Sequence, residues 1–261
     1  MTNKIIHNFD NRRNIALPGN EEDTITFAVN HFIGSAQNAI EAKGSFSVAL
    51  SGGSTPKKIF QQLALPKHRE AIQWERVYLF WSDERSVSPE DPDSNYKMAM
   101  DAGLALLPIP KNQIHRMVAE KDIKQNAKEY ENCLKKHLGK TNLDLVMLGM
   151  GDDGHTASLF PGTKALNISN CYIVANEVPS KKTWRMTFTY PLINSANEIV
   201  IYVIGKNKKE RLASVLLDHS DSAPSGKVGT SNHPALWIID DAGAEKLLES
   251  WNYKKQTRNA I

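Results

Sequence analysis

Residues 143–162 read LDLVMLGMGDDGHTASLFPG, and this stretch decides the fold class. From Leu143 to Leu148 every residue except Asp144 is apolar, which is typical of a strand buried on both faces of a sheet. A glycine-rich polar segment follows at once and predicts a loop at the carboxyl end of that strand. We therefore expect residues 149–162 to form an active-site loop on an α/β scaffold, with His155 at its chemical centre.

Two other strand-to-loop junctions precede it. The apolar run 46–50 leads into SGGSTP at 51–56 and a helical pattern from Pro56 to Ala64. The run 77–81 ends at SDER, and a turn at 91–94 then leads to a helical pattern over 95–107. Because the carboxyl ends of parallel strands meet at one edge of a sheet, the three polar clusters are expected to gather there.

The remaining pattern continues the alternation of strands and helices. It predicts a class α/β fold, Rossmann-like, with a mostly parallel sheet covered by helices on both faces. A single domain is expected over residues 1–261, with its core at about 20–250. Further helices are predicted at 21–42 and 122–138 and after Asn207 and Ala242, and further strands at 172–175, 185–189, 199–204 and 236–239.

Composition narrows the class of partner. The 261 residues include 32 basic and 29 acidic side chains, a balance too even to indicate nucleic acid or a membrane, although a small anionic ligand would suit it. Cys133 and Cys171 belong to no metal or redox motif and are expected to be reduced. The amino terminus lacks a signal-like apolar region and no stretch is long enough to span a bilayer, so we expect a cytoplasmic enzyme.

The SGGSTP cluster favours anion binding. Gly52 and Gly53 allow close backbone approach, and Pro56 suits a first helical turn whose free amides face a ligand. The alternative is an ordinary helix cap by Ser54 or Thr55. The segment is not a Walker A loop, because the GK[ST] ending is absent.

The WSDER cluster places Asp83, Glu84 and Arg85 after a strand, so at least one of them should face the cleft. The alternative is a solvated run of charges. A guanidinium here could stabilise an oxyanion or hold a phosphate, and the sequence does not choose between these roles.

The third cluster admits a dinucleotide interpretation, because its glycines satisfy GxGxxG and Glu177 lies near the distance of a ribose-binding acid. Pro161 and Gly162 argue against it, since they would end the following helix after barely two turns. His155 beside Asp152 and Asp153 instead suits proton transfer.

These three clusters together make the sequence resemble the 6-phosphogluconolactonase branch of the glucosamine-6-phosphate isomerase/6-phosphogluconolactonase family, from about residue 22 to 248. DPDSNY at 91–96, RMTFTYPLIN at 185–194 and PALWIIDDAGAEKL at 234–247 support the match. The deaminase branch typically has DEY in place of residues 83–85 and isoleucine-alanine-phenylalanine-asparagine in place of 156–159. Both differences favour the lactonase branch.

The resemblance implies hydrolysis of 6-phospho-D-glucono-1,5-lactone to 6-phosphogluconate, the second step of the oxidative pentose phosphate pathway, without metal or organic cofactor. It implies that His155 is a general base oriented by Asp153, and that Arg85 or backbone amides stabilise the oxyanion. The substrate phosphate would lie near Gly52, Gly53, Ser54 and Thr55, with Arg185 and Lys208 as basic partners.

Some assignments stay open at this stage. Lys208 lies in KNKK, so Lys206 and Lys209 are alternative lysines for contact with the substrate. His233, in the loop before the last strand, is expected to be a partly exposed loop histidine. The alternative functions are an isomerase or deaminase acting on an amino-sugar phosphate, and a sugar-phosphate sensor without turnover. No pattern in the sequence predicts an oligomeric state.

Overall fold

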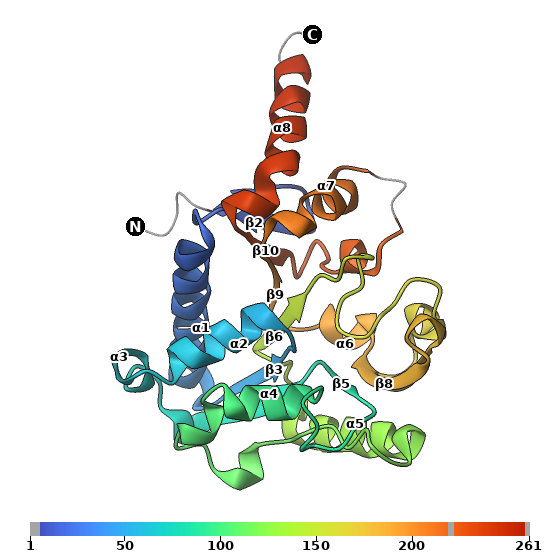
Figure 1. Ribbon diagram of the computed structural model, residues 1–261. Coiled ribbons are helices and arrows are strands. Elements are labelled where there is room, and N and C mark those ends of the chain that lie inside the picture. The colour runs from blue at the N-terminus through green and yellow to red at the C-terminus, as the bar shows by residue number, and fades with distance from the viewer. Residues whose placement is uncertain (1–5, 219–221, 259–261) are drawn as a thin grey trace.

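The fold is built on a seven-stranded sheet in the order β1-β2-β10-β9-β6-β3-β4 (Figure 1). The computed structural model describes residues 6–218 and 222–258. All neighbours in the sheet are parallel except β1 and β2. Its strands are β1 (Ile6–Asn8), β2 (Arg13–Ala16), β3 (Phe46–Leu50), β4 (Val77–Trp81), β6 (Leu145–Gly149), β9 (Glu198–Val203) and β10 (Ala235–Ile239).

Helices and a second sheet complete the fold. The helices are α1 (Glu21–Lys43), α2 (Ser54–Leu63), α3 (Pro66–Arg69), α4 (Asn95–Asp101), α5 (Ile123–Leu138), α6 (Tyr190–Ile193), α7 (Lys209–Leu217) and α8 (Asp241–Arg258). Short 3-10 turns include η3 (Leu104–Leu106), η7 (Lys206–Lys208) and η8 (Pro224–Lys227). A small antiparallel sheet, in the order β5-β8-β7, comprises β5 (Asp83–Arg85), β7 (Ile173–Val178) and β8 (Thr183–Phe188).

Burial confirms that helices cover both faces of the large sheet. All five residues of β3 are buried, as are the first four of β6. Since successive side chains of a strand point to opposite faces, burial of every residue requires cover on both sides. The predicted class, a mostly parallel Rossmann-like sheet, is therefore confirmed.

The strand order creates a crevice at the carboxyl edge of the sheet. The chain runs from β3 to β4 on one side, whereas β6 leads to β9 and β10 on the other. The direction of winding thus reverses between β3 and β6, and ligands of open α/β sheets bind outside the carboxyl ends of the strands at such a point. The segments after β3 and β6 are SGGSTP and GMGDDGH.

The helix boundaries reflect local capping. The Asn20 side chain accepts a hydrogen bond from the Asp23 amide at the start of α1, and Gly44 ends this helix in the left-handed conformation at φ 81°. The helix predicted over 95–107 was wrong beyond Asp101. Gly103 adopts φ 120°, which interrupts the helix, and the chain resumes as a 3-10 turn at η3.

Three parts of the sheet organisation were not predicted. The strands β1 and β2, at one edge of the large sheet, come from the segment before residue 20, where no strand was expected. The strands expected at 172–175 and 185–189 form β7 and β8 of the small sheet rather than extending the large one. Asp83–Arg85 was expected to be a loop but pairs with β8 as β5. Strand pairing of this kind depends on residues about a hundred positions apart, so a local pattern does not reveal it.

Two further features bear on sequence expectations. Cys133 and Cys171 are both free thiols. Within residues 6–218 and 222–258, no helix combines the length with the apolar composition that a bilayer crossing requires.

Three partly buried histidines have contacts that oppose their protonation in the folded state. His115 stacks on Phe80 at a ring distance of 4.7 Å, and His137 shares a hydrogen bond with Ser47 Oγ at 2.7 Å. Burial lowers the pKa of both histidines, and repulsion between the two rings lowers that of His137 further. The pKa of His31 is also lowered by burial, although Glu198 opposes this.

We predict that the unfolding temperature falls as the pH is lowered from about 7.5 to about 5.5. An unfolded histidine takes up a proton near pH 6.5, whereas these folded histidines resist protonation, so acid favours the unfolded state as the pH drops below that value. The fall should be smaller in His115→Phe, which keeps the stacked ring. His233→Gln serves as the control, and an equal fall in all three proteins would contradict the prediction.

Candidate active site

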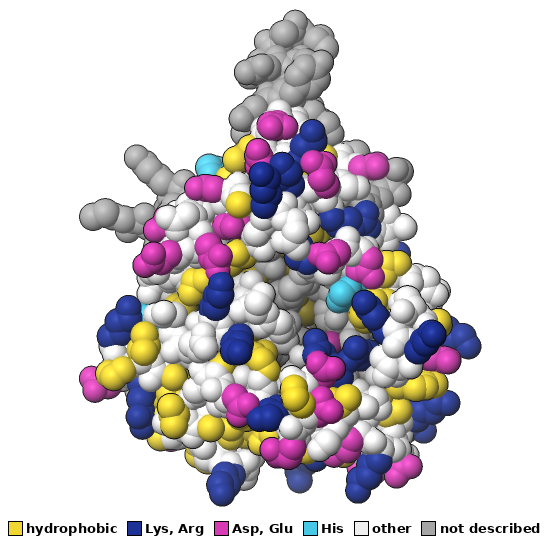
Figure 2. Space-filling view, in the orientation of Figure 1, with side chains coloured by type: hydrophobic (Ala, Val, Ile, Leu, Met, Phe, Trp, Pro, Cys, Tyr) yellow, Lys and Arg dark blue, Asp and Glu magenta, His cyan; other side chains and the backbone are white. Residues whose placement is uncertain are grey.

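A cleft of about 240 Å³ opens at the carboxyl edge of the large sheet, where β3, β6 and β9 end. Figure 2 shows a hollow on this face with basic side chains and a histidine beside it. The predicted residues His155, Arg85, Gly52, Gly53, Ser54, Thr55, Arg185 and Lys208 all line the cleft. Segments far apart in the sequence are therefore brought to one site.

The SGGSTP segment presents the start of α2 to the cleft. Gly53 is the capping residue, with φ 106°, and no side chain caps the helix by hydrogen bonding. The alternative of a Ser54 or Thr55 cap is therefore wrong. Gly52 is required for space, because a Cβ there would lie 1.8 Å from Asn95 Oδ1. Uncapped amides at a helix start favour binding of an anion.

The charged residues of WSDER lie in two different surroundings. Asp83 and Arg85 line the cleft, whereas Glu84 is buried and only 3% exposed. The Glu84 carboxylate accepts the backbone amides of Asn95 and Tyr96, each at 2.8 Å, and thereby holds the start of α4. Burial raises the pKa of Glu84, against the effect of these amides. Glu84 is thus a structural residue.

Two arginines face each other across the small sheet. Arg85 of β5 and Arg185 of β8 are directly paired positions, and both line the cleft. Burial lowers the pKa of Arg185, and the positive charge of Arg85 lowers it further. Like charges directly opposite on paired strands repel. An anion bound between the two guanidinium groups would relieve this repulsion.

His155 is held by two members of its own loop. Its Nδ1 lies 2.6 Å from Asp153 Oδ1, and its ring stacks on Phe160 at a centroid distance of 4.1 Å. Burial opposes ionisation of Asp153, but hydrogen bonds from the His155 amide and ring outweigh it and lower the pKa of Asp153. An ionised carboxylate only accepts hydrogen bonds, so Nδ1 carries a proton. In the neutral imidazole, the lone pair is then on Nε2.

The loop conformation excludes the dinucleotide interpretation. After β6 ends at Gly149, residues 150–163 contain turns and no helix. A dinucleotide fingerprint requires a helix whose start faces the pyrophosphate. Gly151 serves a different purpose, because a Cβ on it would lie 2.1 Å from the His155 ring. This glycine leaves the space that the imidazole occupies.

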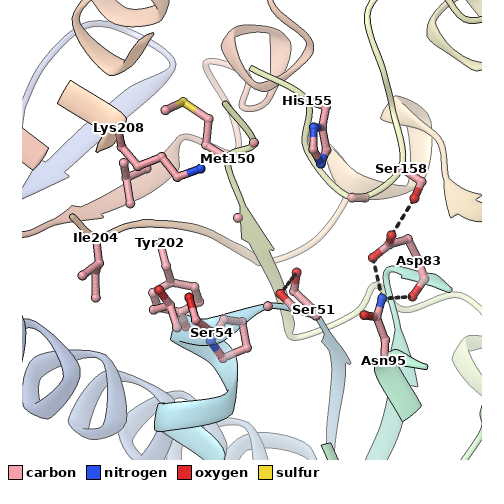
Figure 3. Close-up of a pocket in the computed structure, with 18 of the residues that line it drawn as sticks. Ser51, Ser54, Asp83, Asn95, Met150, His155, Ser158, Tyr202, Ile204 and Lys208 are labelled. Atoms are coloured by element: carbon pink, nitrogen blue, oxygen red, sulfur yellow. Dashed lines mark hydrogen bonds between the residues drawn. The ribbon is translucent and has the colours of Figure 1, made fainter. Parts of the chain in front are cut away.

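The adjacent aspartates have separate partners. Asp153 contacts His155, whereas Asp152 accepts a hydrogen bond from Lys208 at the other side of the cleft. The hydrogen bond and charge of Lys208 lower the pKa of Asp152. Figure 3 shows the Lys208 side chain reaching into the cleft from one side and the His155 ring facing it from the other.

The other candidate basic residues lie elsewhere. Lys209 forms an ion pair with Glu245 at 2.8 Å, and Lys206 is not among the residues that line the cleft. Lys208 is therefore the lysine of KNKK that reaches the site. His233 lies in a loop outside the cleft, where its amide donates to Thr230 Oγ1.

Several lining residues escaped the sequence analysis. Asn95 donates to Asp83, Ser158 donates to Asp83 as well, and Tyr202 of β9 adds a phenol whose pKa is raised by burial. Asn95 belongs to DPDSNY and Ser158 to HTASLFPG, so both lay within quoted motifs. Tyr202 lies in an apolar strand without any local signal. Among the described residues, no three His, Cys, Asp or Glu side chains converge as metal ligands.

Comparison with known proteins shows the family to which the chain belongs. The sequence pattern of the glucosamine-6-phosphate isomerases/6-phosphogluconolactonase family matches residues 19–237, most of the chain. The chain belongs to this family, which confirms the resemblance inferred from its motifs.

Relatives within the family point to one branch. The 6-phosphogluconolactonase of Chlamydia muridarum is 41% identical over 221 residues, covering 84% of this chain and 84% of the relative. That of Chlamydia pneumoniae is 38% identical over 235 residues, covering 89% of this chain and 90% of the relative. The solved structure of 6-phosphogluconolactonase from Trypanosoma cruzi has a TM-score of 0.80 at 27% identity, and the match covers 93% of this chain and 98% of that one.

We predict that Gly151→Ala displaces the His155 ring while leaving the fold intact. The added methyl meets a side chain that can rotate away, so the unfolding temperature should change little. The kcat of the enzyme should fall roughly a hundredfold, because displacing a reacting group by about 1 Å commonly lowers the rate by that factor. Steady-state kinetics and thermal unfolding check this. Gly34→Ala, in α1 with no atom within 4 Å of the new Cβ, is the control and should leave turnover unchanged.

Proposed function

We propose that this chain hydrolyses 6-phospho-D-glucono-1,5-lactone to 6-phosphogluconate, the second step of the oxidative pentose phosphate pathway. The observation that carries the proposal is a His155–Asp153 pair facing a cleft with cationic groups at two places. The names of the curated relatives, which the chain matches over most of its length, support the same reaction.

In this proposal His155 is the general base. Its Nε2 takes a proton from the water that attacks C1 of the lactone, and Asp153 stabilises the imidazolium that results. The tetrahedral intermediate collapses with cleavage of the bond between C1 and the ring oxygen. The imidazolium returns the proton to that oxygen, so one lactone and one water give one hydroxy acid. No electron transfer and no third reactant are involved.

The cationic groups of the cleft fall into two sets. Lys208 and the uncapped start of α2 make one set, with Ser54 and Thr55 at the helix start. Arg85 and Arg185 of the small sheet make the other. We assign the substrate phosphate to the first set, because a helix start and a lysine that line the same cleft suit a dianion. The arginine pair then serves the oxyanion that develops at C1. This proposal gives Arg185 a different role from the phosphate binding that the family resemblance implied, because Arg185 is paired with Arg85.

The alternatives within the fold are less well supported. A deaminase would act on an amino-sugar phosphate in the same cleft, but Arg85 and Ser158 occupy positions where that branch typically has tyrosine and phenylalanine. A sensor would need the cleft without turnover. Nothing in such a role would require His155 to be held at 2.6 Å by a carboxylate.

The decisive experiment measures lactone hydrolysis by the purified protein above the spontaneous rate. We expect clear catalysis by the wild type and a loss of about a hundredfold or more in His155→Ala, since removal of a general base commonly costs that much. A wild-type rate equal to that of buffer would refute the proposal. Release of ammonia and fructose 6-phosphate from glucosamine 6-phosphate would assign the chain to the deaminase branch instead.

We predict that substitutions in the two cationic sets change different steady-state parameters. Lys208→Met should raise KM about tenfold or more with a smaller effect on kcat, because a charged hydrogen bond to the phosphate is lost in ground and transition states alike. Arg85→Met should instead lower kcat by about a hundredfold. Lys209→Met is the matched control, since that lysine pairs with Glu245. The reverse pattern would exchange the two assignments.

A further inference from the structure

Ser158 connects the His155 loop to all three strands of the small sheet. Only 2% of this residue is exposed. Its Oγ donates to Asp83 Oδ2 of β5 at 2.6 Å, and its amide donates to Thr187 Oγ1 of β8 at 3.1 Å. Its carbonyl accepts from Asn176 Nδ2 of β7 at 2.9 Å. Every polar group of Ser158 is thus bonded to the sheet that carries the arginine pair.

The acceptor of the Ser158 hydroxyl is itself fixed. Asp83 is buried, and its second oxygen accepts from Asn95 Nδ2 at 3.2 Å (Figure 3). The Asp83 carboxylate also lies close enough to Arg185 to raise the pKa of that guanidinium, against the effect of burial. A hydrogen bond to a carboxylate is stronger than one between neutral groups. The bond from Ser158 therefore ties the loop to a rigid charged group beside Arg185.

The opposite end of the loop is attached to a different part of the molecule. The Asp153 carbonyl accepts from Arg211 Nη2 of α7 at 3.2 Å, and the Gly154 carbonyl accepts from the Ser225 amide of η8 at 3.0 Å. The contacts that orient the His155 ring, by contrast, come from within the loop itself. The distance from His155 to the arginine pair consequently depends on the downstream anchor at Ser158.

The segment between these anchors is under backbone strain. Ala157 lines the cleft and adopts φ 46°, in the left-handed region that disfavours residues with a side chain. A hydrogen bond from the Leu159 amide to the Thr156 carbonyl at 2.9 Å closes the turn around it. Such a conformation persists only where neighbouring contacts hold it, and Ser158 is the next residue in the chain.

We propose that Ser158 is a positioning residue for catalysis, an inference that rests on the proposed function of His155 as a base. By bonding the loop to β5, β7 and β8, Ser158 sets the position of the His155 imidazole relative to Arg85 and Arg185. Its hydroxyl acts through Asp83 and takes no part in proton transfer.

The test compares Ser158→Ala with Ser35→Ala. Ser35 is a matched control, because it is buried in α1, away from the cleft, and its Oγ donates to Glu198 Oε2 at 2.7 Å. Each variant loses one hydroxyl bonded to a carboxylate, so both should show a lower unfolding temperature. Only Ser158→Ala should lower kcat, by roughly tenfold or more, with KM changed much less. Amide hydrogen exchange in peptides covering 150–163 should accelerate in that variant alone.

The two readouts separate this inference from the proposed function. Unchanged exchange in Ser158→Ala would overturn the anchoring role whatever the activity. Accelerated exchange with unchanged kcat, in a protein whose activity His155→Ala abolishes, would overturn the link to catalysis. If the wild type does not hydrolyse the lactone, the proposed function fails and with it the catalytic role of Ser158, whereas the exchange measurement still decides whether Ser158 holds the loop.

Discussion

Burial of both faces of the parallel sheet is the constraint on which the rest of the structure depends. All of β3 and most of β6 are buried on both faces of the sheet. The polar segments that follow these strands therefore lie at the carboxyl edge of the sheet. The reversal of winding between the two strands leaves a crevice at that edge. The glycine-rich segment after β3 and the histidine loop after β6 therefore lie at the same cleft, although they are far apart along the chain.

The cleft brings several positively charged side chains close together. Lys208 donates a hydrogen bond to Asp152, whereas Arg85 and Arg185 occupy directly paired positions on neighbouring strands. Arg85 donates to the Asp93 carbonyl at 2.6 Å, which orients the guanidinium without cancelling its charge. The carboxylates of Asp83, Glu84 and Asp93 balance part of this charge and raise the pKa of Arg185, against the effect of burial. Under the proposed function, a phosphorylated lactone adds a phosphate and a developing oxyanion.

The small sheet contributes the arginine side chains of the site. Its strands come from segments around residues 84, 175 and 185, and they carry the arginine pair as well as the groups that form hydrogen bonds with Ser158. The large sheet positions His155 and the helix start, while the small sheet positions the guanidinium groups. The Asp83–Ser158 hydrogen bond links the His155 loop to the small sheet, so under the proposed mechanism the distance between His155 and the guanidinium groups depends on this bond.

Much of the architecture could be predicted from local pattern. The strands at 46–50 and 77–81 have the predicted bounds, because a short apolar run between turn residues is a local signal. The extension of a helix to Leu107 was wrong because Gly103 interrupts the chain at a single dihedral angle. The separate antiparallel sheet was missed because pairing between β5 and β8 joins residues a hundred positions apart.

The sequence by itself determined the fold class, the family, and the loop that carries His155, since each depends on residues that are neighbours in the chain. Only the tertiary structure decided which acid serves which partner: Asp153 holds the imidazole, Asp152 holds Lys208, and Glu84 holds α4. It also decided that Lys208 rather than Lys209 reaches the cleft and that Arg85 faces Arg185. These choices follow from strand order, register and helix orientation, which arise from packing between distant segments and have no counterpart in local sequence.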